Sequence, residues 1–393
     1  MSQILLAHEW LLPIISFVVA FLPVCWIHPR LVKVAYMKEI VDKPDQRKLQ
    51  RRPIPVLGGV AVFFGIALVA GTFSPFYDSS QMVMILAAMT VMLYIGTLDD
   101  ILTLSPGFRL FVEIVCVVLL IVVDGVMIDH FHGLWGIGAI PWAVSVGLTV
   151  LAAVGIINAI NLIDGVNGLS SGFCILACAS FMVFFFNARD ITMVLLAAGC
   201  IGALIPFFVH NVFGKTSRMF IGDGGTLVMG LVMSVFVIHT LDNSSLGAVF
   251  APKRLGLIPF SLAVLSVPIF DTLRVMSARV KRHESPFHPD KTHLHHLFIG
   301  LGFSHIGTTL SILALNSLVI VGWWGLYRCG WSVDAQLYFV IAAGLLATSG
   351  IYFGVKALPR KGRVYRALRL LGYASHIERK PWFLRLRKVV DRV

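Results

Sequence analysis

The stretch Met193–Val212, MVLLAAGCIGALIPFFVHNV, contains no Asp, Glu, Lys or Arg. A helix needs roughly 17 to 20 apolar residues to cross the hydrocarbon layer of a bilayer, which is about 30 Å thick. The rest of the 393-residue chain repeats this pattern, since 58% of it is hydrophobic, 13% is charged and its mean hydropathy is +0.86. A soluble core could not absorb so much apolar surface. The sequence therefore predicts an all-α fold, a polytopic transmembrane helical bundle.

We expect about 11 spans of this kind. They are Trp10–Ile27, Gly58–Phe73, Met82–Leu98, Leu110–Val126, Trp142–Ile160, Leu169–Phe186, Met193–Val212, Thr226–Thr240, Leu257–Thr272, Ile306–Tyr327 and Leu337–Val355. The six cysteines lie mostly inside apolar runs and form no CxxC pair, so we expect them to be small core residues rather than disulfides or metal ligands.

Lys and Arg are distributed unevenly between alternate loops. Of the 32 in the chain, one side of the expected bundle holds only Arg189, Lys253, Arg254 and Arg328. Because basic residues favour cytoplasmic loops, the N-terminus is expected outside and the C-terminus in the cytosol. Residues 1–355 then form a transmembrane domain with cytosolic loops, and residues 356–393 form a basic cytosolic tail. The net charge of +12 lies at an anionic membrane face, and no basic soluble domain suggests a nucleic-acid partner.

Four unusual polar motifs lie at span ends on the expected cytosolic face. They are LDDILTL (98–104), NAINLIDGVNGLSSG (158–172), RMFIGDGGTL (218–227) and HPDKTHLHHLF (288–298). If the spans form one bundle, these carboxylates, amides and imidazoles converge on one cleft.

Each motif also has a plain structural interpretation. The paired aspartates can mark the water boundary, the Asn- and Gly-rich segment can be a turn, and IGDGG can cap a helix. The histidines can belong to a solvated loop or to a zinc site, although no spacing matches a typical zinc pattern. Against these, an acidic cluster able to bind metal, beside histidines next to Arg279, Lys281, Arg282 and Lys291, is what a diphosphate with Mg²⁺ requires.

The order of these motifs resembles the polyprenyl-phosphate N-acetylhexosamine-1-phosphate transferases. Within that superfamily, DKPDQRK, PIPVLGG, SPFHPD and HLHHL resemble the WecA-like branch, whereas the peptidoglycan branch has three histidines in a row. The resemblance covers nearly the whole chain from Leu31. It implies an enzyme of the bacterial inner membrane with a cytosolic active site, which makes undecaprenyl-diphosphate-GlcNAc and UMP from UDP-GlcNAc and undecaprenyl phosphate.

The resemblance also implies partners and a biological setting. The cofactor is Mg²⁺, with Mn²⁺ as a substitute, and the partners are UDP-GlcNAc, undecaprenyl phosphate and membrane lipids. The product would start O-antigen or related lipopolysaccharide and surface polysaccharide synthesis. No nucleic acid is expected, and a homodimer is left open.

The resemblance assigns roles residue by residue. The acidic pair reacts, with Asp99 as base for the lipid phosphate and Asp100 near the metal, whose principal ligand is Asp223. The other implied roles are uracil stacking for Phe220, lining of the nucleotide site for Asn161 and catalytic Asp164, a cation near the phosphates for Arg109, and binding of the diphosphate or sugar for Arg279, catalytic His293, His295 and His296.

One position departs from the family pattern. The family reads DGxDG where this chain reads DGVNG, with Asn167 at the second acidic position. An amide can still hydrogen-bond the uracil there, but it supplies no charge.

Several alternatives stay open at this stage. Direct attack by the lipid phosphate competes with a covalent aspartyl intermediate, and UDP-GalNAc or a UDP-linked deoxy-amino sugar competes with UDP-GlcNAc. A transporter would place its acids near the bilayer midplane and would show inverted repeats, neither of which the sequence suggests.

Overall fold

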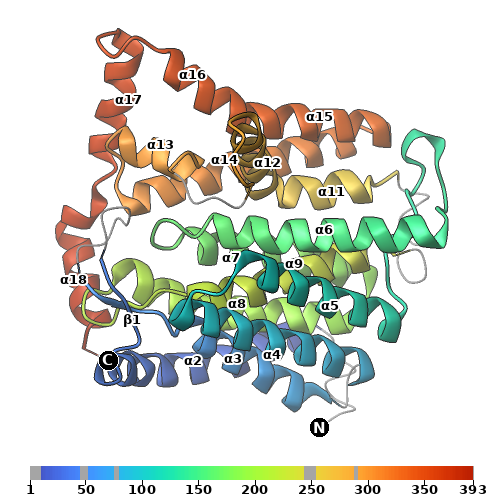
Figure 1. The fold of residues 1–393 in the computed structure, drawn as a ribbon, viewed down its shortest axis with the longest axis horizontal. Helices are drawn as coiled ribbons and strands as arrows, with labels where there is room; N and C mark the ends of the chain where they lie inside the picture. The colour runs from blue at the N-terminus through green and yellow to red at the C-terminus, as the bar shows by residue number, and fades with distance from the viewer. Residues whose placement is uncertain (1–9, 45–51, 75–78, 243–253, 287–290, 393) are drawn as a thin grey trace. The chain divides into compact units, whose positions relative to one another are not determined.

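The computed structural model describes residues 10–44, 52–74, 79–242, 254–286 and 291–392 (Figure 1). Over these ranges the regular secondary structure is helical, apart from one antiparallel pair of two-residue strands, β1 (Val41–Asp42) and β2 (Ile54–Pro55), and an isolated bridge between His130 and Ala139. Nine helices of the described residues are long and apolar enough to cross a membrane, or up to ten if a bent pair counts as one span. The predicted polytopic helical bundle is therefore confirmed.

The number of crossings and the orientation of the termini stay predictions. The expected span at Gly58–Phe73 forms a helix of only 16 residues, and the expected span at 257–272 is broken in two. Parts of two motifs lie outside the described residues, namely Asp45–Lys48 of DKPDQRK and His288–Asp290 of the histidine motif. Arg51 also lies outside them.

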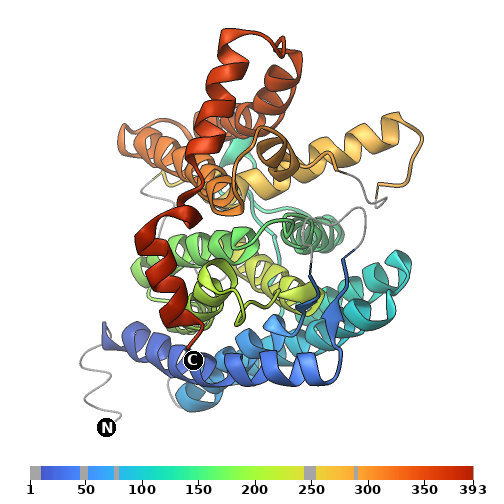
Figure 2. The same cartoon turned by 90° about the vertical axis from the view of Figure 1, so that its left-hand side faces the viewer.

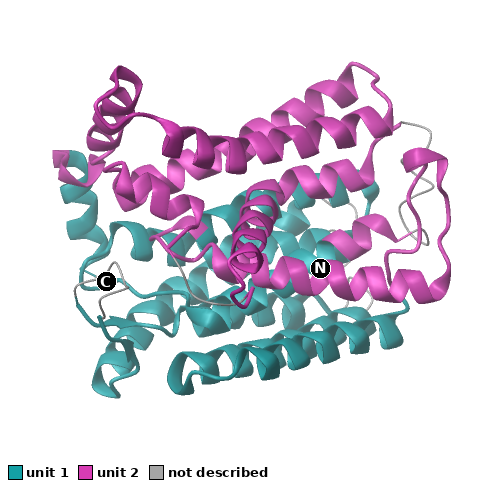
Figure 3. Cartoon of the chain, turned by 45° about the horizontal axis from the view of Figure 1, so that its top comes forward, with its two compact units in different colours: residues 1–125, 170–236, 382–393 teal, residues 126–169, 237–381 magenta. Residues whose placement is uncertain are grey.

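The chain divides into two compact units, Met1–Gly125 with Ser170–Phe236 and Trp382–Val393, and Val126–Leu169 with Val237–Pro381 (Figure 3). Unit 1 contains α2 (Leu11–Met37), β1, β2, α3 (Gly58–Phe73), α4 (Ser79–Leu102), α5 (Pro106–Asp124), α8 (Ile191–Phe213), and most of α7 (Leu169–Ala188), α9 (Gly222–Leu241) and α18 (Pro381–Val390). Unit 2 contains η2 (Leu134–Gly136), α6 (Trp142–Leu162), α11 (Leu257–Val264), α12 (Ser266–Lys281), α13 (Leu294–Gly300), α14 (His305–Arg328), α15 (Val333–Leu345), η4 (Leu346–Gly350), α16 (Ile351–Ala357), α17 (Arg363–Ala374) and η5 (Ile377–Arg379).

In unit 1, α2 packs along α8 and α3, as Figures 1 and 2 show. The N-cap of α8 is Asp190, whose carboxylate accepts a hydrogen bond from the Met193 amide at 3.0 Å. A Cβ on Gly202 of α8 would lie 2.3 Å from the carbonyl oxygen of Phe17, so this glycine lets the two backbones touch. Close approach through small residues is typical of helices that pack in membranes.

Glycines also bring α3 and α4 against the start of α9. A Cβ on Gly59 would lie 2.3 Å from the Gly225 nitrogen, and a Cβ on Gly96 would lie 2.4 Å from the Gly224 nitrogen. The first amides of α3 donate to the loop before α9, from Gly58 to the carbonyl of Phe220 at 3.0 Å and from Gly59 to that of Ile221 at 2.8 Å. These bonds satisfy donors that a helix start leaves without a partner.

In unit 2, a broken helix is held by one asparagine. Helices α11 and α12 meet at an angle of 75°, and Pro268 in the first turn of α12 cannot donate a helical hydrogen bond. Asn316 of α14 binds both sides of the break. Its Oδ1 accepts from Ser266 Oγ at 2.9 Å and from the Val267 amide at 3.0 Å, and its Nδ2 donates to the Val264 carbonyl at 2.9 Å. Polar backbone groups inside a membrane must find such protein partners.

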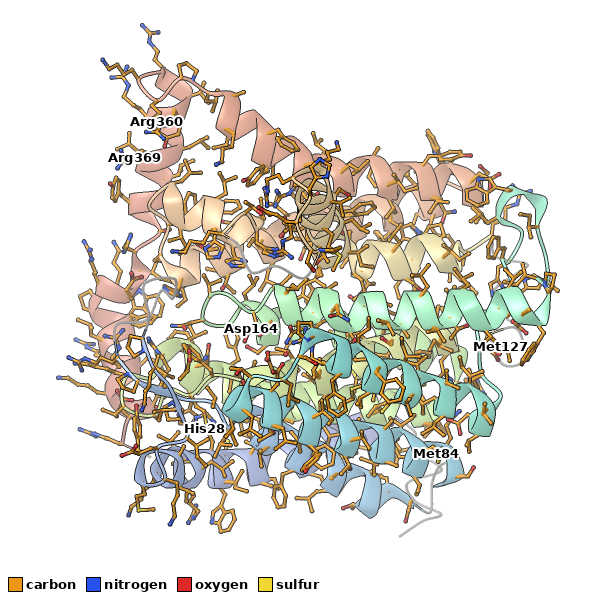
Figure 4. The ribbon with its side chains drawn as sticks, viewed as in Figure 1. His28, Met84, Met127, Asp164, Arg360 and Arg369 are labelled. Carbon is orange, nitrogen blue, oxygen red and sulfur yellow. The ribbon has the colours of Figure 1, made fainter. Side chains whose placement is uncertain are left out.

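The segment that follows α16 is tied back to unit 2 through a serine pair. Ser304 caps α14. Its amide donates to the Ser375 hydroxyl at 3.0 Å, and its hydroxyl donates to the Ser375 carbonyl at 2.8 Å. Arg360 and Arg369 of this segment are exposed (Figure 4), and Arg369 of α17 donates to the hydroxyl of Tyr373 on the same helix. Residues 382–393, in contrast, group with unit 1.

The Gly59 contact gives the first prediction. Gly59→Ala places a methyl group against the backbone of α9, and overpacking of this kind costs roughly 1 to 3 kcal/mol. We expect a lower midpoint of thermal unfolding in detergent. Gly71→Ala is the matched control on the same helix, because nothing lies within 4 Å of its Cβ position. Equal midpoints for the two variants would show that the close approach of Gly59 to α9 does not contribute to stability.

Candidate active site

In unit 1, the acidic pair at the end of α4 meets the start of α9. Asp100 accepts hydrogen bonds from the amide of Asp223 to Oδ1 at 3.1 Å and from that of Gly224 to Oδ2 at 3.4 Å. The carboxylate thus caps a helix N-terminus from another helix, where negative charge is favoured. Gly222 makes room for it, since its φ is +70° and a Cβ there would lie 2.4 Å from Asp100 Oδ2.

Arg109 connects three carboxylates of unit 1. Its Nη1 lies 3.2 Å from Asp99 Oδ2 and 3.9 Å from Asp223 Oδ2, and its Nε lies 3.5 Å from Glu113 Oε1. Asp99 is held further by the Leu104 amide, which donates to its Oδ1 at 2.6 Å. The predicted residues Asp99, Arg109 and Asp223 are therefore brought together.

The charges around Arg109 favour a further cation. The carboxylates of Asp99, Glu113 and Asp223 lie within 4 Å of one guanidinium, and Asp100 bonds the amide of Asp223 beside them. The Asp223 side chain is 36% exposed, which leaves its oxygens accessible. No group of three or more His, Cys, Asp or Glu in the described residues is arranged as a metal cage. Mg²⁺ does not need one, because it commonly uses one or two carboxylates together with waters and substrate phosphates.

Phe220 lies half-buried three residues before Asp223, in the loop between α8 and α9. Its amide donates to the Pro55 carbonyl of β2 at 2.8 Å, and its carbonyl accepts from Gly58. The backbone at Phe220 is thus fixed on both sides. This places the predicted uracil-stacking ring in unit 1 with the predicted metal ligand.

The Asn-rich motif lies in unit 2, at the end of α6 and in the turn that follows. Asp164 is exposed there, and its amide donates to the Asn161 carbonyl at 3.2 Å (Figure 4). The backbone of Asn167 is held from α14, because its amide donates to His305 Nδ1 at 3.2 Å and its carbonyl accepts from Thr309 Oγ1 at 2.9 Å. The turn therefore has a defined shape, whichever residue occupies position 167.

His293 belongs to a buried ion network in unit 2. Its Nδ1 lies 3.0 Å from Asp271 Oδ2, and Asp271 also accepts from Arg274 Nη2 at 2.6 Å and from the Leu294 amide at 3.1 Å. Arg274 donates in turn to the Thr292 carbonyl at 2.7 Å. The network fixes the ring, and within the described residues its buried Nε2 has no hydrogen-bond partner. With Nδ1–H donated to a carboxylate, Nε2 can accept a proton.

His295 packs against the Asn-rich turn. A Cβ on Gly165 would lie 2.0 Å from His295 Nε2, so the glycine of DGVNG makes room for the imidazole. The ring stacks at 5.7 Å from that of His293 and lies 4.3 Å from that of His296. Burial, together with the charges of His296 and His293, lowers the pKa of His295 from 6.5 to about 3. It is therefore neutral at physiological pH and can donate to a phosphate only as a neutral imidazole.

Arg279 is 1% exposed, and its Nη1 donates to the Pro286 carbonyl at 2.5 Å. This bond holds the segment that leads to the histidine motif. His296, by contrast, is half-buried. The structure thus brings the predicted residues together as two groups, one in each unit. Their functional roles, and their convergence on one cleft, stay predictions.

Sequence reasoning assigned no site role to three charged residues of these groups, Glu113, Asp271 and Arg274. Glu113 follows Arg109 by four residues, and Asp271 precedes Arg274 by three, the spacings that put partners on one helix face. Acids inside apolar runs usually mark functional positions. That signal, combined with the spacing to an arginine, could have found all three.

Comparison with known proteins places this architecture among sugar transferases. Residues 82–241 match the model of glycosyl transferase family 4. A Bacillus subtilis protein named probable undecaprenyl-phosphate N-acetylglucosaminyl 1-phosphate transferase is 30% identical over 306 residues, which cover 77% of this chain and 82% of that protein. This chain belongs to the family of undecaprenyl-phosphate N-acetylglucosaminyl 1-phosphate transferases.

Family members from other bacteria give the same result. Proteins named undecaprenyl-phosphate α-N-acetylglucosaminyl 1-phosphate transferase from Yersinia pestis and Escherichia coli O157:H7 are 27% and 28% identical. Each match covers 74% of this chain, with 78% and 77% of the respective relative. The WecA-like resemblance of the sequence motifs is thereby confirmed.

Glu113 gives the second prediction. Glu113→Gln keeps the size of the side chain and removes its charge, so Arg109 is held by fewer carboxylates. We expect the initial rate of sugar-1-phosphate transfer to fall at least roughly tenfold, equivalent to about 1.4 kcal/mol. Asp124→Asn, at the other end of α5, is the control and should keep the wild-type rate. A fully active Glu113→Gln enzyme would mean that Arg109 needs no support from this residue.

The buried His295 gives the third prediction. Below pH 6.5 the unfolded chain binds a proton at this position, whereas the folded chain does not until about pH 3. Its contribution to stability is therefore complete above pH 6.5 and falls with pH by up to about 1.4 kcal/mol per unit. Thermal melts of wild type and His295→Asn between pH 7.5 and 4.5 check this (roughly the range in which histidine titrates). The variant should lose less stability per pH unit, and parallel curves would contradict the assignment.

Proposed function

We propose that this protein transfers GlcNAc-1-phosphate from UDP-GlcNAc to undecaprenyl phosphate, giving undecaprenyl-diphosphate-GlcNAc and UMP. The observation that carries the proposal is the cluster of Asp99, Arg109 and Asp223. Asp223 follows the aromatic residue Phe220 by three positions in the chain. An arginine and a metal-ready carboxylate suit a diphosphate, and an adjacent aromatic ring suits a base. The names of the relatives support the same reaction.

The reaction forms one phosphorus–oxygen bond and breaks another. A phosphate oxygen of the lipid attacks the β-phosphorus of UDP-GlcNAc, and the bond from that phosphorus to the bridging oxygen breaks. UMP leaves with the electron pair. Arg109 lies within reach of Asp99 and Asp223, so its guanidinium is placed to stabilise the phosphoryl oxygens as charge develops.

The contacts of the acidic pair favour direct attack over a covalent aspartyl intermediate. Both oxygens of Asp100 accept amides of α9, and both oxygens of Asp99 are engaged by Leu104 and Arg109. A carboxylate fixed in this way cannot move to form a bond to phosphorus, but each oxygen keeps a lone pair that can take up a proton. Asp99 is instead placed to accept a proton from a lipid phosphate that arrives as a monoanion, the role of a general base.

Mg²⁺ fits the carboxylates of Asp223 and Asp100, whose oxygens are the ligands that this ion prefers. When bound, the ion neutralises charge on the phosphoryl oxygens. The protein residues orient the diphosphate around it. Mn²⁺ has the same ligand preference and is expected to substitute.

The groups of unit 2 complete the proposal. His293, fixed by Asp271 through Nδ1, presents Nε2 as a proton acceptor or donor. Asn167 replaces the usual acid with an amide that can still hydrogen-bond uracil. Asp164 on the same turn is exposed.

The membrane setting supplies the biological context. A multi-pass enzyme can take a long isoprenoid lipid from the bilayer and a sugar nucleotide from water. We propose that the active site faces the cytosol of a bacterial inner membrane, where UDP-sugars are made. The product would start O-antigen or a related surface polysaccharide.

The fourth prediction tests the reaction directly. Purified protein with undecaprenyl phosphate, Mg²⁺ and UDP-GlcNAc should release UMP, and chelation should stop it. Asp223→Asn should lower the rate by roughly 100-fold or more, the loss typical of a removed electrostatic contact to the transition state. A panel of UDP-N-acetylhexosamines run in parallel identifies the sugar. No UMP release from any of them, or full activity of Asp223→Asn, would refute the proposal.

A further inference from the structure

The loop between α8 and α9, residues 214–221, carries Phe220 and leads directly into Asp223. Its backbone is held from several sides within unit 1. His28 Nε2 of α2 lies 2.9 Å from the Ser217 carbonyl, and Asn211 Nδ2 donates to the Met219 carbonyl at 2.7 Å. The His28 ring also stacks on that of His210 at 4.3 Å. These contacts fix carbonyl groups of the loop and leave the amides of residues 215–217 to another partner.

That partner comes from the end of the chain. The Asp391 carboxylate accepts hydrogen bonds from three successive amides, those of Lys215 at 2.9 Å, Thr216 at 3.0 Å and Ser217 at 3.1 Å. The Ser217 hydroxyl donates to the same Oδ1 at 3.0 Å. Successive amides that converge on one anion form a nest, a backbone arrangement that binds negative charge.

The helix before Asp391 is docked on the same part of unit 1. Phe383 of α18 is 1% exposed, and its ring lies 5.0 Å from that of Phe213, the last residue of α8. Arg387 Nε donates to the Phe213 carbonyl at 3.4 Å, and Val390 is buried. The carboxylate is thus delivered by a helix that has its own apolar anchor.

Asp391 is negatively charged, and all its partners in the loop are hydrogen-bond donors. Partial burial opposes ionisation, but the bonds from Lys215, Ser217 and Thr216 outweigh it and hold the pKa of Asp391 below its usual value. The group is therefore ionised at neutral pH, and the bonds to it are charge-assisted. An amide at this position would keep one acceptor oxygen and lose the charge.

We propose that Asp391 is a positioning residue for the nucleotide site. By fixing the amides of residues 215–217 from the C-terminal tail, it holds the loop so that Phe220 faces the uracil and Asp223 faces the diphosphate. The inference rests on the proposed function, because it takes a uridine nucleotide as the ligand of Phe220. It assigns a role to a tail that the sequence suggests only as a basic surface.

A merely structural role would make a different prediction. Loss of a purely structural contact lowers the fraction of folded enzyme, and so lowers the apparent kcat for both substrates together. Loss of a positioning contact weakens the uridine nucleotide selectively, since misplacement of binding groups by about 1 Å can cost up to roughly 100-fold. The KM for UDP-GlcNAc should rise, while the KM for undecaprenyl phosphate should stay unchanged.

The test uses full-length protein in detergent with four single variants, and with Phe220→Ala alone and combined with Asp391→Ala. Asp391→Ala removes all the bonds, Asp391→Asn keeps one acceptor, and Ser217→Ala removes only the hydroxyl bond. Arg392→Ala, an exposed neighbour, is the matched control. Hydrogen exchange of the amides of residues 215–217 reports on the contact, titration with UDP reports on nucleotide binding, and steady-state kinetics separate the two KM values.

We expect Asp391→Ala to lose amide protection at residues 215–217 and to weaken UDP binding roughly tenfold, about 1.4 kcal/mol by the conversion of affinity to free energy. Asp391→Asn should lie between Asp391→Ala and wild type, and Arg392→Ala should match wild type. Combined with Phe220→Ala, Asp391→Ala should add little, because both changes act through the same ring.

Other outcomes overturn the inference. Unchanged amide protection in Asp391→Ala would show that the contact does not hold the loop. Lost protection with unchanged UDP affinity would show that the loop needs no such support. If the wild-type protein binds UDP but releases no UMP with any sugar nucleotide, the proposed function fails while the binding data still decide this inference. A wild type that releases UMP but binds no UDP overturns this inference and leaves the proposed function standing.

Discussion

The contact of the Asp100 carboxylate with the first amides of α9 organises much of unit 1. It joins the end of α4 to the start of α9 and leaves room only for glycine at position 222. It also places a negative charge where the helix dipole favours one. Because α9 is completely surrounded by protein over its most apolar stretch, its N-terminal amides need a partner from the chain. The residue that satisfies this need also belongs to the acidic cluster around Arg109, so one carboxylate serves both fold and chemistry.

In unit 2, too, one carboxylate has several partners. Asp271 neutralises Arg274, orients His293 and accepts the first amide of α13. A buried carboxylate with this many donors stays ionised without a free charge in an apolar region. His295 then needs no charge, and its neutral ring fills the space that Gly165 leaves. The two motifs that the sequence separates by more than a hundred residues are therefore parts of one packed assembly within this unit.

The sequence predicts the long helices well because their length and apolar content are local properties. Met193–Val212 lies within α8, and Trp142–Ile160 lies within α6. The acidic pair and Asp223 stand out as carboxylates against apolar surroundings, and the family resemblance adds Phe220; the structure places Asp99, Asp100, Phe220 and Asp223 in unit 1, while their roles stay predictions. The break between α11 and α12 and the docking of Asp391 could not be predicted. Both depend on partners far away in the chain, and neither Asn316 nor Asp391 differs locally from an ordinary polar residue.

The break in the α11–α12 span has a consequence for how the protein is made. The ribosome delivers Val264, Ser266 and Val267 to the membrane about 50 residues before it delivers Asn316, which binds their backbone groups. During that interval these groups have no partner from α14, and an unsatisfied amide or carbonyl is costly in hydrocarbon. Until α14 emerges, these groups can be satisfied at low cost only outside the hydrocarbon, by water or lipid headgroups. A substitution at Asn316 would therefore impair insertion of this segment into the membrane, a step that comes before the active site is formed.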